Sequence, residues 1–428
     1  MKAERATWQE CPRCGARRGS EFAESECPDC GSLLDVRHER PALSGQALAE
    51  LFRSRRGASG PDASGVWRFR ELVLPGAADD VVTQPEGNTP LLSRDAITRW
   101  VGVETLRVKH EGHNPTGSFK DRGMTVGMTQ AKRRRVRAVA CASTGNTSAS
   151  LAAYAALAAI PALVFVPAGR VATGKLAQTL AYGARTLLVR GDFDACMNLV
   201  REASRKLDVY LLNSVNPYRL EGQKTIVLEA LEQLGWEPPD WIVLPAGNLG
   251  NTSAFGKALA EARDAGLIPR LPRLAAVQAE GANPFARSFR QGFARAHALR
   301  AETVATAIRI GDPASHDRAV AAIRATNGVV TDVADGDILE AKAVVDAAGI
   351  GCEPASAASI AGARRLVREG TIRPGERVVA ILTGHLLKDP DAILAYHAGQ
   401  NRVPTSNPPV EIEPELAEVE RVLDRSRS

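Results

Sequence analysis

The chain has 428 residues, 44% of them hydrophobic and 24% charged, and it carries a net charge of +5. This length predicts two globular domains with a small appendage, and this composition excludes disorder of the whole chain. The charge is modest and its densest basic run is confined to 132–135, which argues against a dedicated nucleic-acid-binding protein. Residues 138–169 carry no charge, but polar residues and Pro161 interrupt them, so we expect no membrane-spanning helix.

Two CxxC pairs stand near the N-terminus. Twelve residues separate the pairs, whose cysteines are Cys11, Cys14, Cys27 and Cys30. Four thiolates at this spacing can bind zinc tetrahedrally, and four protein ligands leave no open position, so the metal would be structural. We therefore predict a zinc ribbon over 1–38 and a linker over 39–65. A redox pair and two disulfides are the alternatives. The other three cysteines are scattered, which favours a reducing, cytoplasmic setting.

From residue 66 onward, short apolar runs alternate with Ala-rich segments of helical length. The predicted strands are Leu106–Lys109, Ala138–Ala142, Ala162–Val166, Thr186–Val189, Trp241–Leu244, Leu274–Gln278 and Val378–Leu382. The predicted helices include Thr147–Ala159, Phe193–Leu207 and Thr252–Ala265, and a further exposed helix, Glu415–Arg425, near the C-terminus. Such alternation is typical of an α/β fold whose parallel sheets are covered by helices on both faces.

Ligands of parallel sheets bind at the carboxyl ends of the strands, and the loop after Leu106–Lys109 is unusual. Residues 114–117 read Asn-Pro-Thr-Gly, a turn, and Ser118 is a predicted helix N-cap. Lys120 would then lie in the first helical turn, where the helix dipole disfavours a cation and lowers the pKa of the amine. A Schiff-base lysine needs such a pKa. The alternative is an exposed lysine on an amphipathic helix.

The loop after Ala138–Ala142 consists of six small or amide residues, 143–148, and opens directly into a predicted helix. Hydroxyl groups and free N–H groups at a helix N-terminus bind anions such as a carboxylate. Asn146 could also hydrogen-bond a substituent of an aromatic ring. A long N-cap is the alternative, although capping requires only one such residue.

The loop after Trp241–Leu244 is rich in glycine. Gly247 and Gly250 let several backbone N–H groups converge ahead of a predicted helix, which suits a phosphate. The pattern is neither a P-loop nor the GxGxxG dinucleotide motif. An ordinary Gly-Asn turn is the alternative.

Thr383 follows the predicted strand Val378–Leu382. Its hydroxyl could hydrogen-bond a pyridine nitrogen without keeping that nitrogen protonated, as an aspartate would, and this favours eliminations and replacements. The alternative is a common strand-end threonine.

A lysine, an anion site and a phosphate cradle together suit a phosphorylated aldehyde cofactor held covalently.

Five stretches resemble the threonine synthase family, in the fold-type-II group of pyridoxal-phosphate enzymes that includes the tryptophan synthase β subunit. They are 111–123, 143–150, 247–251, 351–359 and 382–390, and 213–224 is also similar. The resemblance implies two three-layer domains, each built on a parallel sheet. The large cofactor-binding domain would comprise 66–130 and 215–400, and the small domain 131–214, before a tail over 401–428.

The resemblance also implies roles toward the cofactor, pyridoxal 5'-phosphate. Lys120 would hold it covalently and shuttle protons during the reaction. Asn146 would hydrogen-bond its phenolic oxygen, and Thr383 its pyridine nitrogen. Its phosphate would be bound by Gly247, Asn248, Leu249, Gly250 and Asn251.

For the substrate, the resemblance implies O-phospho-L-homoserine, which reacts with water to give L-threonine and phosphate. Ser143, Thr144 and Thr147 would hold the substrate carboxylate. Asn213 and Arg219, with Lys175 as a weaker candidate, would hold the substrate phosphate. The enzyme would be a homodimer with no nucleic-acid or membrane partner. One departure from the family is Leu386, where a glycine is usual, and it puts substrate detail in question.

Three other functions remain open at this point. A related enzyme acting on O-phosphoserine, such as a cysteate synthase, differs by one methylene of substrate length. A threonine dehydratase would not need the phosphate candidates. A zinc-ribbon nucleic-acid-binding protein on an inactive scaffold is disfavoured, because aromatic residues make up only 5% of the chain and do not interleave with the basic run.

Overall fold

The computed structural model describes residues 6–77, 80–169, 173–399 and 405–425, with the side chains of 173–175 and 424–425 left out. Within these residues the chain divides into two units, Met1–Lys388 and Asp389–Ser428. The first unit contains three separate β-sheets. The second contains the helices α15 (Pro390–Ala398) and α16 (Leu416–Arg425), so the predicted C-terminal helix begins one residue later than expected. Among the described residues, no helix has both the length and the apolar character needed to cross a membrane.

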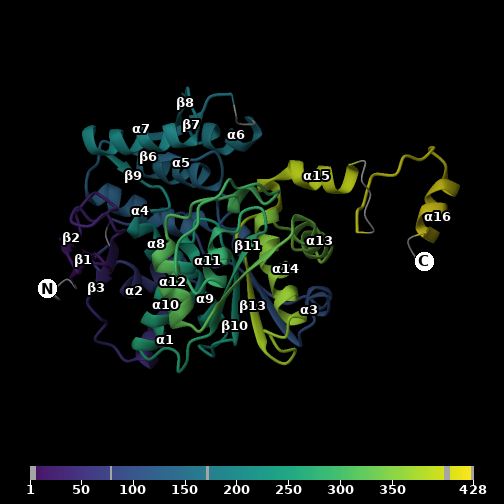
Figure 1. Cartoon of the computed structure of the whole chain (residues 1–428), viewed down its shortest axis with the longest axis horizontal. Coiled ribbons are helices and arrows are strands. Elements are labelled where there is room, and N and C mark those ends of the chain that lie inside the picture. The colour runs from purple at the N-terminus through teal and green to yellow at the C-terminus, as the bar shows by residue number, and fades with distance from the viewer. Residues whose placement is uncertain (1–5, 78–79, 170–172, 400–404, 426–428) are drawn as a thin grey trace. The chain divides into compact units, whose positions relative to one another are not determined.

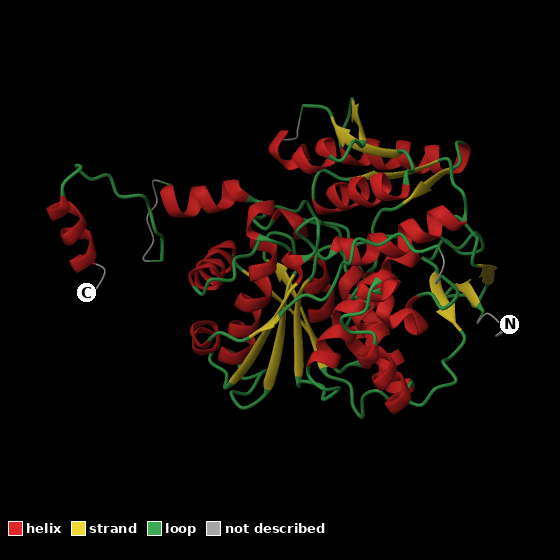
Figure 2. Ribbon diagram, turned by 180° about the vertical axis from the view of Figure 1, so that it is seen from behind, coloured by secondary structure: helices red, strands yellow, loops and turns green. Residues whose placement is uncertain are grey.

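The largest sheet has six strands in the order β12-β11-β10-β13-β5-β4 (Figures 1 and 2). Its strands are β4 Leu91–Leu92, β5 Thr105–His110, β10 Trp241–Pro245, β11 Arg273–Ala279, β12 Val329–Val333 and β13 Arg377–Leu382. Neighbouring strands run parallel, except that β4 is antiparallel to β5. Parallel strands are buried on both faces, and β10 shows the result. Ile242 and Leu244 belong to one hydrophobic core, and Trp241 and Val243 belong to the core on the opposite face.

Helices cover both faces of this sheet (Figure 2). The helices whose residues pack into these two cores or against the sheet are α1 Gly45–Ser54, α2 Arg70–Val73, α3 Asp95–Val101, α8 Pro217–Gln223, α9 Thr225–Gln233, α10 Gly250–Asp264, α11 Pro284–Arg290, α12 His316–Ala325, α13 Asp335–Ala347 and α14 Pro354–Arg368. This arrangement brings the loops at the carboxyl ends of β5, β10 and β13 to one edge of the sheet.

The second sheet is parallel throughout and has the order β8-β7-β6-β9. Its strands are β6 Ala138–Ala142, β7 Ala162–Pro167, β8 Arg185–Val189 and β9 Val209–Leu211, and its helices are α4 Lys120–Arg133, α5 Asn146–Ala158, α6 Thr173–Ala181 and α7 Phe193–Lys206. Side chains of α4 and α5 share one core with the sheet, and Cys196 and Val200 of α7 share the other. Two sheets with helices on both faces confirm the predicted α/β class, while the exact domain boundaries stay predictions.

The third sheet is the small antiparallel ribbon at the N-terminus, with strands β1 Thr7–Glu10, β2 Arg17–Gly19 and β3 Asp35–His38 in the order β2-β1-β3. It lies beside α8 and α4 in Figure 1, and Val36 of β3 reaches into the core of the large sheet. The fully buried apolar residues of the ribbon's own core are only Cys11, Cys27 and Leu34. A core of this size is too small to stabilise a fold without a crosslink or a metal.

Candidate functional site

The lysine loop and the end of β13 are joined through their backbones. The N–H of Phe119 donates to the carbonyl of Thr383 at 2.9 Å, and the N–H of His385 donates to the carbonyl of Gly117 at 2.9 Å. The two segments are far apart in the sequence, so this short bridge brings Lys120 and Thr383 to the same edge of the large sheet. Two of the predicted site residues are therefore placed together.

The N-cap of α4 is Phe119, one residue later than predicted, because an isolated β-bridge to Gly384, just after β13, fixes the backbone of Ser118. The hydroxyl of Ser118 still accepts from the N–H of Lys120 at 3.4 Å, and Lys120 lies in the first helical turn as predicted. Asp121 accepts hydrogen bonds from the N–H and the hydroxyl of Thr116, both at 2.7 Å, and so closes the preceding turn.

Arg122 holds the same turn against the large sheet. It is fully buried, and its guanidinium bonds Glu111 at 2.6 Å and Glu229 at 2.8 Å. Lys109 of β5 also pairs with Glu229. Buried charges that are paired and hydrogen-bonded in this way hold a backbone in one place. The network therefore fixes the first turn of α4, which contains Lys120 two residues before Arg122.

The pKa of Lys120 is lowered to about 7 from an ordinary value of 10.5. Burial is the largest cause, although the side chain keeps some accessible surface. The guanidinium of Arg219 lowers the pKa further, and the carboxylate of Glu353 opposes both. Burial, more than the helix dipole, thus accounts for the depression that the sequence suggested. A large fraction of the amine is neutral at physiological pH and can act as a nucleophile.

The polar loop after β6 leads into α5, which begins at Asn146. Among the described residues, the hydroxyl groups of Thr144 and Thr147 make no hydrogen bond. Ser143 accepts one from the N–H of Gly145 at 3.3 Å. All three side chains are half-buried at a helix N-terminus, where partial positive charge and free N–H groups favour a carboxylate.

Glu353 is a site residue that the sequence did not single out, although it lies within one of the resembling stretches. It is buried directly before α14 and accepts hydrogen bonds from the amide of Asn146 at 2.9 Å and from the hydroxyl of Thr383 at 3.1 Å. Burial raises the pKa of its carboxyl, and Asn146 and Thr383 oppose that rise. Ser356 also bonds Thr383, with 3.0 Å between the two oxygens. Glu353 therefore links the two side chains predicted to contact the cofactor ring.

The glycine loop follows β10 and provides unpaired backbone donors. Within the described chain, the N–H groups of 247–252 have no acceptor, and the polar side-chain oxygens of Asn251 and Thr252 are buried without partners. A Cβ on Gly247 would lie 3.0 Å from the Cα of Ile308, so the backbone of this loop closely approaches that residue. Leu249 takes a φ of 63°, which turns the chain into α10. Unpaired donors at a helix N-terminus form an anion cradle.

Arg219 of α8 is 0% exposed and has no carboxylate within ion-pair distance in the part of the chain that the structure describes. One of its nitrogens donates to the carbonyl of Leu212 at 3.0 Å, while Nε and the other terminal nitrogen have no partner. Burial lowers its pKa to about 10. An unpaired buried guanidinium is costly unless an anion joins it.

The other phosphate candidates are placed less clearly. The amide of Asn213 is engaged with both the N–H and the carbonyl of Ala142, at 3.0 and 3.1 Å, so it holds the polar loop in this structure. Ser214, which the sequence did not single out, contacts the amide of Asn248. The side chain of Lys175 lies outside the described residues.

Leu386, the departure from the family, packs against Gly351. A Cβ on Gly351 would lie 2.5 Å from Cδ2 of Leu386, and Gly351 has a φ of 75°. A glycine at 351 therefore makes the room that the larger residue at 386 needs.

The four cysteines of the ribbon come together. Their sulfur atoms all lie within 4.8 Å of one another, and the N–H groups of Gly15 and Gly31 fold back onto Cys11 and Cys27. A tetrahedral zinc with bonds of about 2.3 Å needs sulfur atoms separated by about 3.8 Å. The observed separations are 3.4 Å for Cys11–Cys30 and 3.7 Å for Cys14–Cys27, so the residues present fit a zinc ion.

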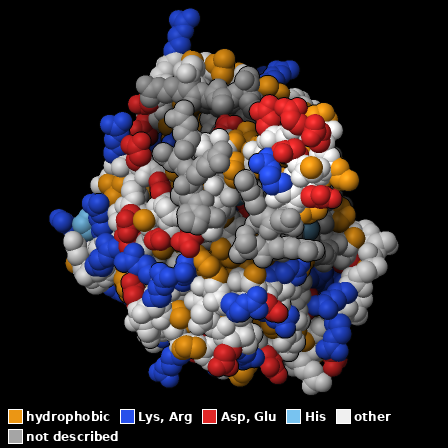
Figure 3. Space-filling model, turned by 90° about the vertical axis from the view of Figure 1, so that its right-hand side faces the viewer, with side chains coloured by type: hydrophobic (Ala, Val, Ile, Leu, Met, Phe, Trp, Pro, Cys, Tyr) orange, Lys and Arg blue, Asp and Glu red, His pale blue; other side chains and the backbone are white. Residues whose placement is uncertain are grey.

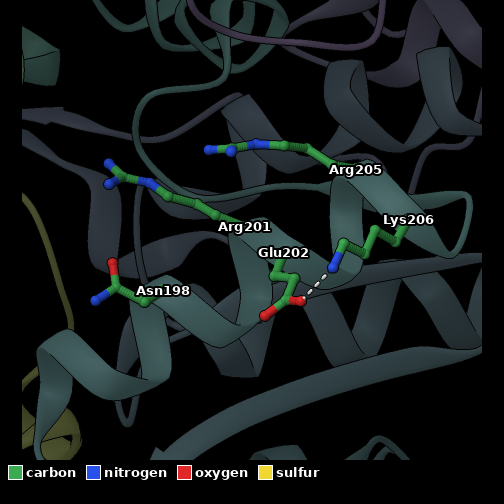
Figure 4. A pocket seen from close by; sticks show the side chains of 5 residues that line it. All are labelled: Asn198, Arg201, Glu202, Arg205 and Lys206. Atoms are coloured by element: carbon green, nitrogen blue, oxygen red, sulfur yellow. Dashed lines mark hydrogen bonds and ion pairs between the residues drawn. The ribbon is translucent and has the colours of Figure 1, made fainter.

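Other surface features do not resemble this site. A hollow on α7 is lined by Asn198, Arg201, Glu202, Arg205 and Lys206 of that one helix, and Glu202 pairs with Lys206 (Figure 4). None of these side chains is buried. On the face seen in Figure 3, Lys and Arg side chains are scattered among Asp and Glu.

Comparison with known proteins agrees with this geometry. A family model described as pyridoxal-phosphate dependent enzyme matches residues 82–384. A threonine synthase of Methanocaldococcus jannaschii is 42% identical over 420 residues, which cover 97% of this chain and 99% of that protein. A threonine synthase of Methanosarcina acetivorans is 46% identical over 386 residues, 90% of this chain and 93% of that one. The solved threonine synthase of Escherichia coli shares the fold, with a TM-score of 0.69 at 18% identity over 98% of this chain and 100% of that chain.

The fold and the matching family define a pyridoxal-phosphate-dependent enzyme of fold type II. Within that class, the chain belongs to the threonine synthase family.

The residues present fit the family's cofactor. The amine of Lys120, whose pKa burial lowers to about 7, lies at the same edge of the large sheet as the unpaired donors of 247–252, as a phosphorylated aldehyde requires. The pKa of Lys120 gives a testable pH dependence. We expect the rate of cofactor attachment to stripped enzyme to rise about tenfold per pH unit below 7 and to level off above it. The rate is measured from the growth of the near-violet absorption band. A rate that keeps rising toward pH 10 would mean that the pKa of the amine is not lowered.

Proposed function

We propose that the protein converts O-phospho-L-homoserine and water into L-threonine and phosphate. The observation that carries this proposal is the fully buried guanidinium of Arg219 with two nitrogens unpaired. A substrate phosphate would give it the partner that the protein does not supply. The family relationship supports the same reaction.

The chain's own residues would divide the work as follows. Ser143, Thr144 and Thr147 orient the substrate through its carboxylate, and Arg219 holds its phosphate. Pyridoxal phosphate, when bound, supplies an electron sink for negative charge at Cα. Lys120 takes the proton from Cα as a general base. A proton then leaves Cβ as phosphate leaves from Cγ. A proton is added at Cγ, the oxygen of water is added at Cβ, and a proton is finally returned to Cα.

Around the cofactor, Asn146 would bond the phenolic oxygen and Thr383 the pyridine nitrogen, with Gly247, Asn248, Leu249, Gly250 and Asn251 around the phosphate. Glu353 bonds both side chains and so would hold them beside the ring. The second N–H of Asn146 would remain for the phenolic oxygen, and the hydroxyl of Thr383 would turn from Glu353 to donate to the pyridine nitrogen. Asn213 stays a candidate for the substrate phosphate only if it releases Ala142.

The substrate is tested by comparing two phosphorylated amino acids. We expect kcat/KM for phosphate release to be at least about tenfold higher with O-phospho-L-homoserine than with O-phospho-L-serine, because one methylene in a shaped pocket contributes about 1–3 kcal/mol. Preference for O-phosphoserine would move the protein to the alternative, cysteate-synthase-like reaction. A dehydratase would act on threonine itself, which has no phosphate. Its substrate would therefore leave the buried guanidinium of Arg219 without an anionic partner.

We also propose that the four ribbon cysteines bind one structural zinc ion. Elemental analysis of protein purified under reducing conditions should find one zinc per chain. Cys14→Ser should lose the metal and lower the melting temperature, because four-ligand zinc sites contribute folding free energy. Cys196→Ser, a buried cysteine outside the cluster, should keep the metal. Metal-free protein with a folded ribbon would contradict this proposal.

The setting proposed for the enzyme is the cytoplasm, and its proposed assembly is a homodimer. The seven cysteines are all free, which suits a reducing compartment. Light scattering on purified protein measures the assembly directly.

A further inference from the structure

Helix α8 packs both on the cysteine ribbon and on α4, the helix of the cofactor lysine, and α4 also contacts the ribbon where Gln130 donates to the carbonyl of Ser20 at 2.6 Å. Tyr218 and Glu221 are three residues apart and face the ribbon, while Arg219 and Gly222, also three apart, face α4. This short helix, labelled α8 in Figure 1, thus carries the proposed phosphate ligand on one side and the ribbon contacts on the other.

The contacts on the ribbon side are polar and specific. The hydroxyl of Tyr218 donates to the carbonyl of Ser20, and the buried carboxylate of Glu221 pairs with His38 of β3 at 3.0 Å. Lys257 of α10 bridges that carboxylate and the carbonyl of Val36. Glu221 is fully buried and also pairs with Lys224, so His38 is the partner that ties this carboxylate directly to the ribbon.

The contacts on the α4 side are close packing. A Cβ on Gly222 would lie 1.7 Å from the carbonyl of Arg122, and one on Gly123 would lie 2.8 Å from the carbonyl of Arg219. Backbone meets backbone here, and the side chain of Arg219 itself lies against Gly127 of α4. The polar anchors of α8 include Tyr218, which bonds the ribbon, and Glu221, which bonds His38 of the ribbon as well as two lysines.

The ribbon depends on its cysteines in turn. Its own core is small, although β3 is also held from outside by Val36 in the large core and by Arg318 at the carbonyl of Leu34. Ser20 lies between the two CxxC pairs, so a crosslink through Cys11, Cys14, Cys27 and Cys30 would close the loop that carries it.

We propose that the metal-bound ribbon is a positioning element for Arg219, so that loss of the metal weakens binding of the substrate phosphate without releasing the cofactor. This inference rests on the proposed function, and it adds a link between metal supply and substrate affinity.

The test uses two ways of loosening α8 without touching Arg219. One is metal-stripped protein, and the other is the double variant His38→Ala with Tyr218→Phe, which keeps the four cysteines. Asp317→Asn is the matched control. It removes a different ribbon contact, the exposed ion pair at 3.1 Å between Arg13 of the ribbon and Asp317 of α12. This ion pair does not involve α8. The probe is inorganic phosphate, titrated calorimetrically into holoenzyme whose cofactor-phosphate cradle is already filled.

We expect the phosphate dissociation constant to rise roughly tenfold in the stripped protein and in the double variant, the size of one weakened hydrogen bond to a charged group. KM for the phosphorylated substrate should rise by the same factor, while kcat and the cofactor absorption band stay at the parent level. Asp317→Asn should match the parent in all four readings.

Unchanged phosphate affinity in the double variant would overturn the inference. So would an affinity that falls only together with the absorption band, since the ribbon would then serve general stability. A parent protein that binds phosphate but forms no threonine would instead count against the proposed function alone.

Discussion

Lys120→Ala is expected to lose the near-violet absorption band of the bound cofactor and to lower kcat by at least about a thousandfold, because the nucleophile and the general base are the same amine. Absorption spectra before and after borohydride, together with phosphate release, measure both effects. Borohydride should abolish the band of the parent protein.

Lys132→Ala provides the matched control on the same helix. Lys132 is exposed in the last turn of α4, so its loss should leave the spectrum and the rate unchanged. Retention of the borohydride-sensitive band in Lys120→Ala would mean that another lysine holds the cofactor, and the assignment of the site would be wrong.

Arg219→Met is expected to separate binding from stability. Removing a charged donor pair should raise KM for O-phospho-L-homoserine about a hundredfold, roughly 3 kcal/mol. The free energy of unfolding without substrate should stay the same or increase, because methionine fills a similar volume without burying an unpaired charge. Steady-state kinetics and denaturant unfolding test the two parts.

Arg122→Met is the comparison that makes this result informative. Arg122 is equally buried but pairs with Glu111 and Glu229, and its loss should cost about 3–5 kcal/mol of stability. If Arg219→Met destabilised the protein as much as Arg122→Met and left KM unchanged, Arg219 would be a structural residue.

The strands that the sequence predicted agree with the structure to within a residue at each end, as β6 and β13 show. β6, β10 and β13 are apolar runs of the kind that parallel sheets bury on both faces. The strand β12 escaped prediction because Asp332 interrupts its apolar run. That carboxylate is buried in the fold and accepts from Asn283 at 2.6 Å, a partner that no local pattern reveals.

The candidate site was likewise predicted only in part from the sequence. Loops that follow strands could be found from the sequence, because their donors and glycines are contiguous along the chain. Glu353 could not, since its partner Asn146 stands 207 residues away and only the fold brings them together. The one local signal was a glutamate before Pro354 at a helix start. The N-cap of α4 lies one residue later than predicted for the same reason, since the backbone of Thr383 bonds Phe119 and sets that turn.

The central claim is that this site removes phosphate from Cγ of the substrate and adds water at Cβ. The most direct measurement is the reaction of O-phospho-L-homoserine in water labelled with the heavy oxygen isotope, followed by mass spectrometry of both products. We expect threonine and phosphate in equal amounts, with the label in the hydroxyl group of threonine and none in the phosphate. Labelled phosphate together with homoserine would show simple hydrolysis of the phosphate ester and would contradict the account.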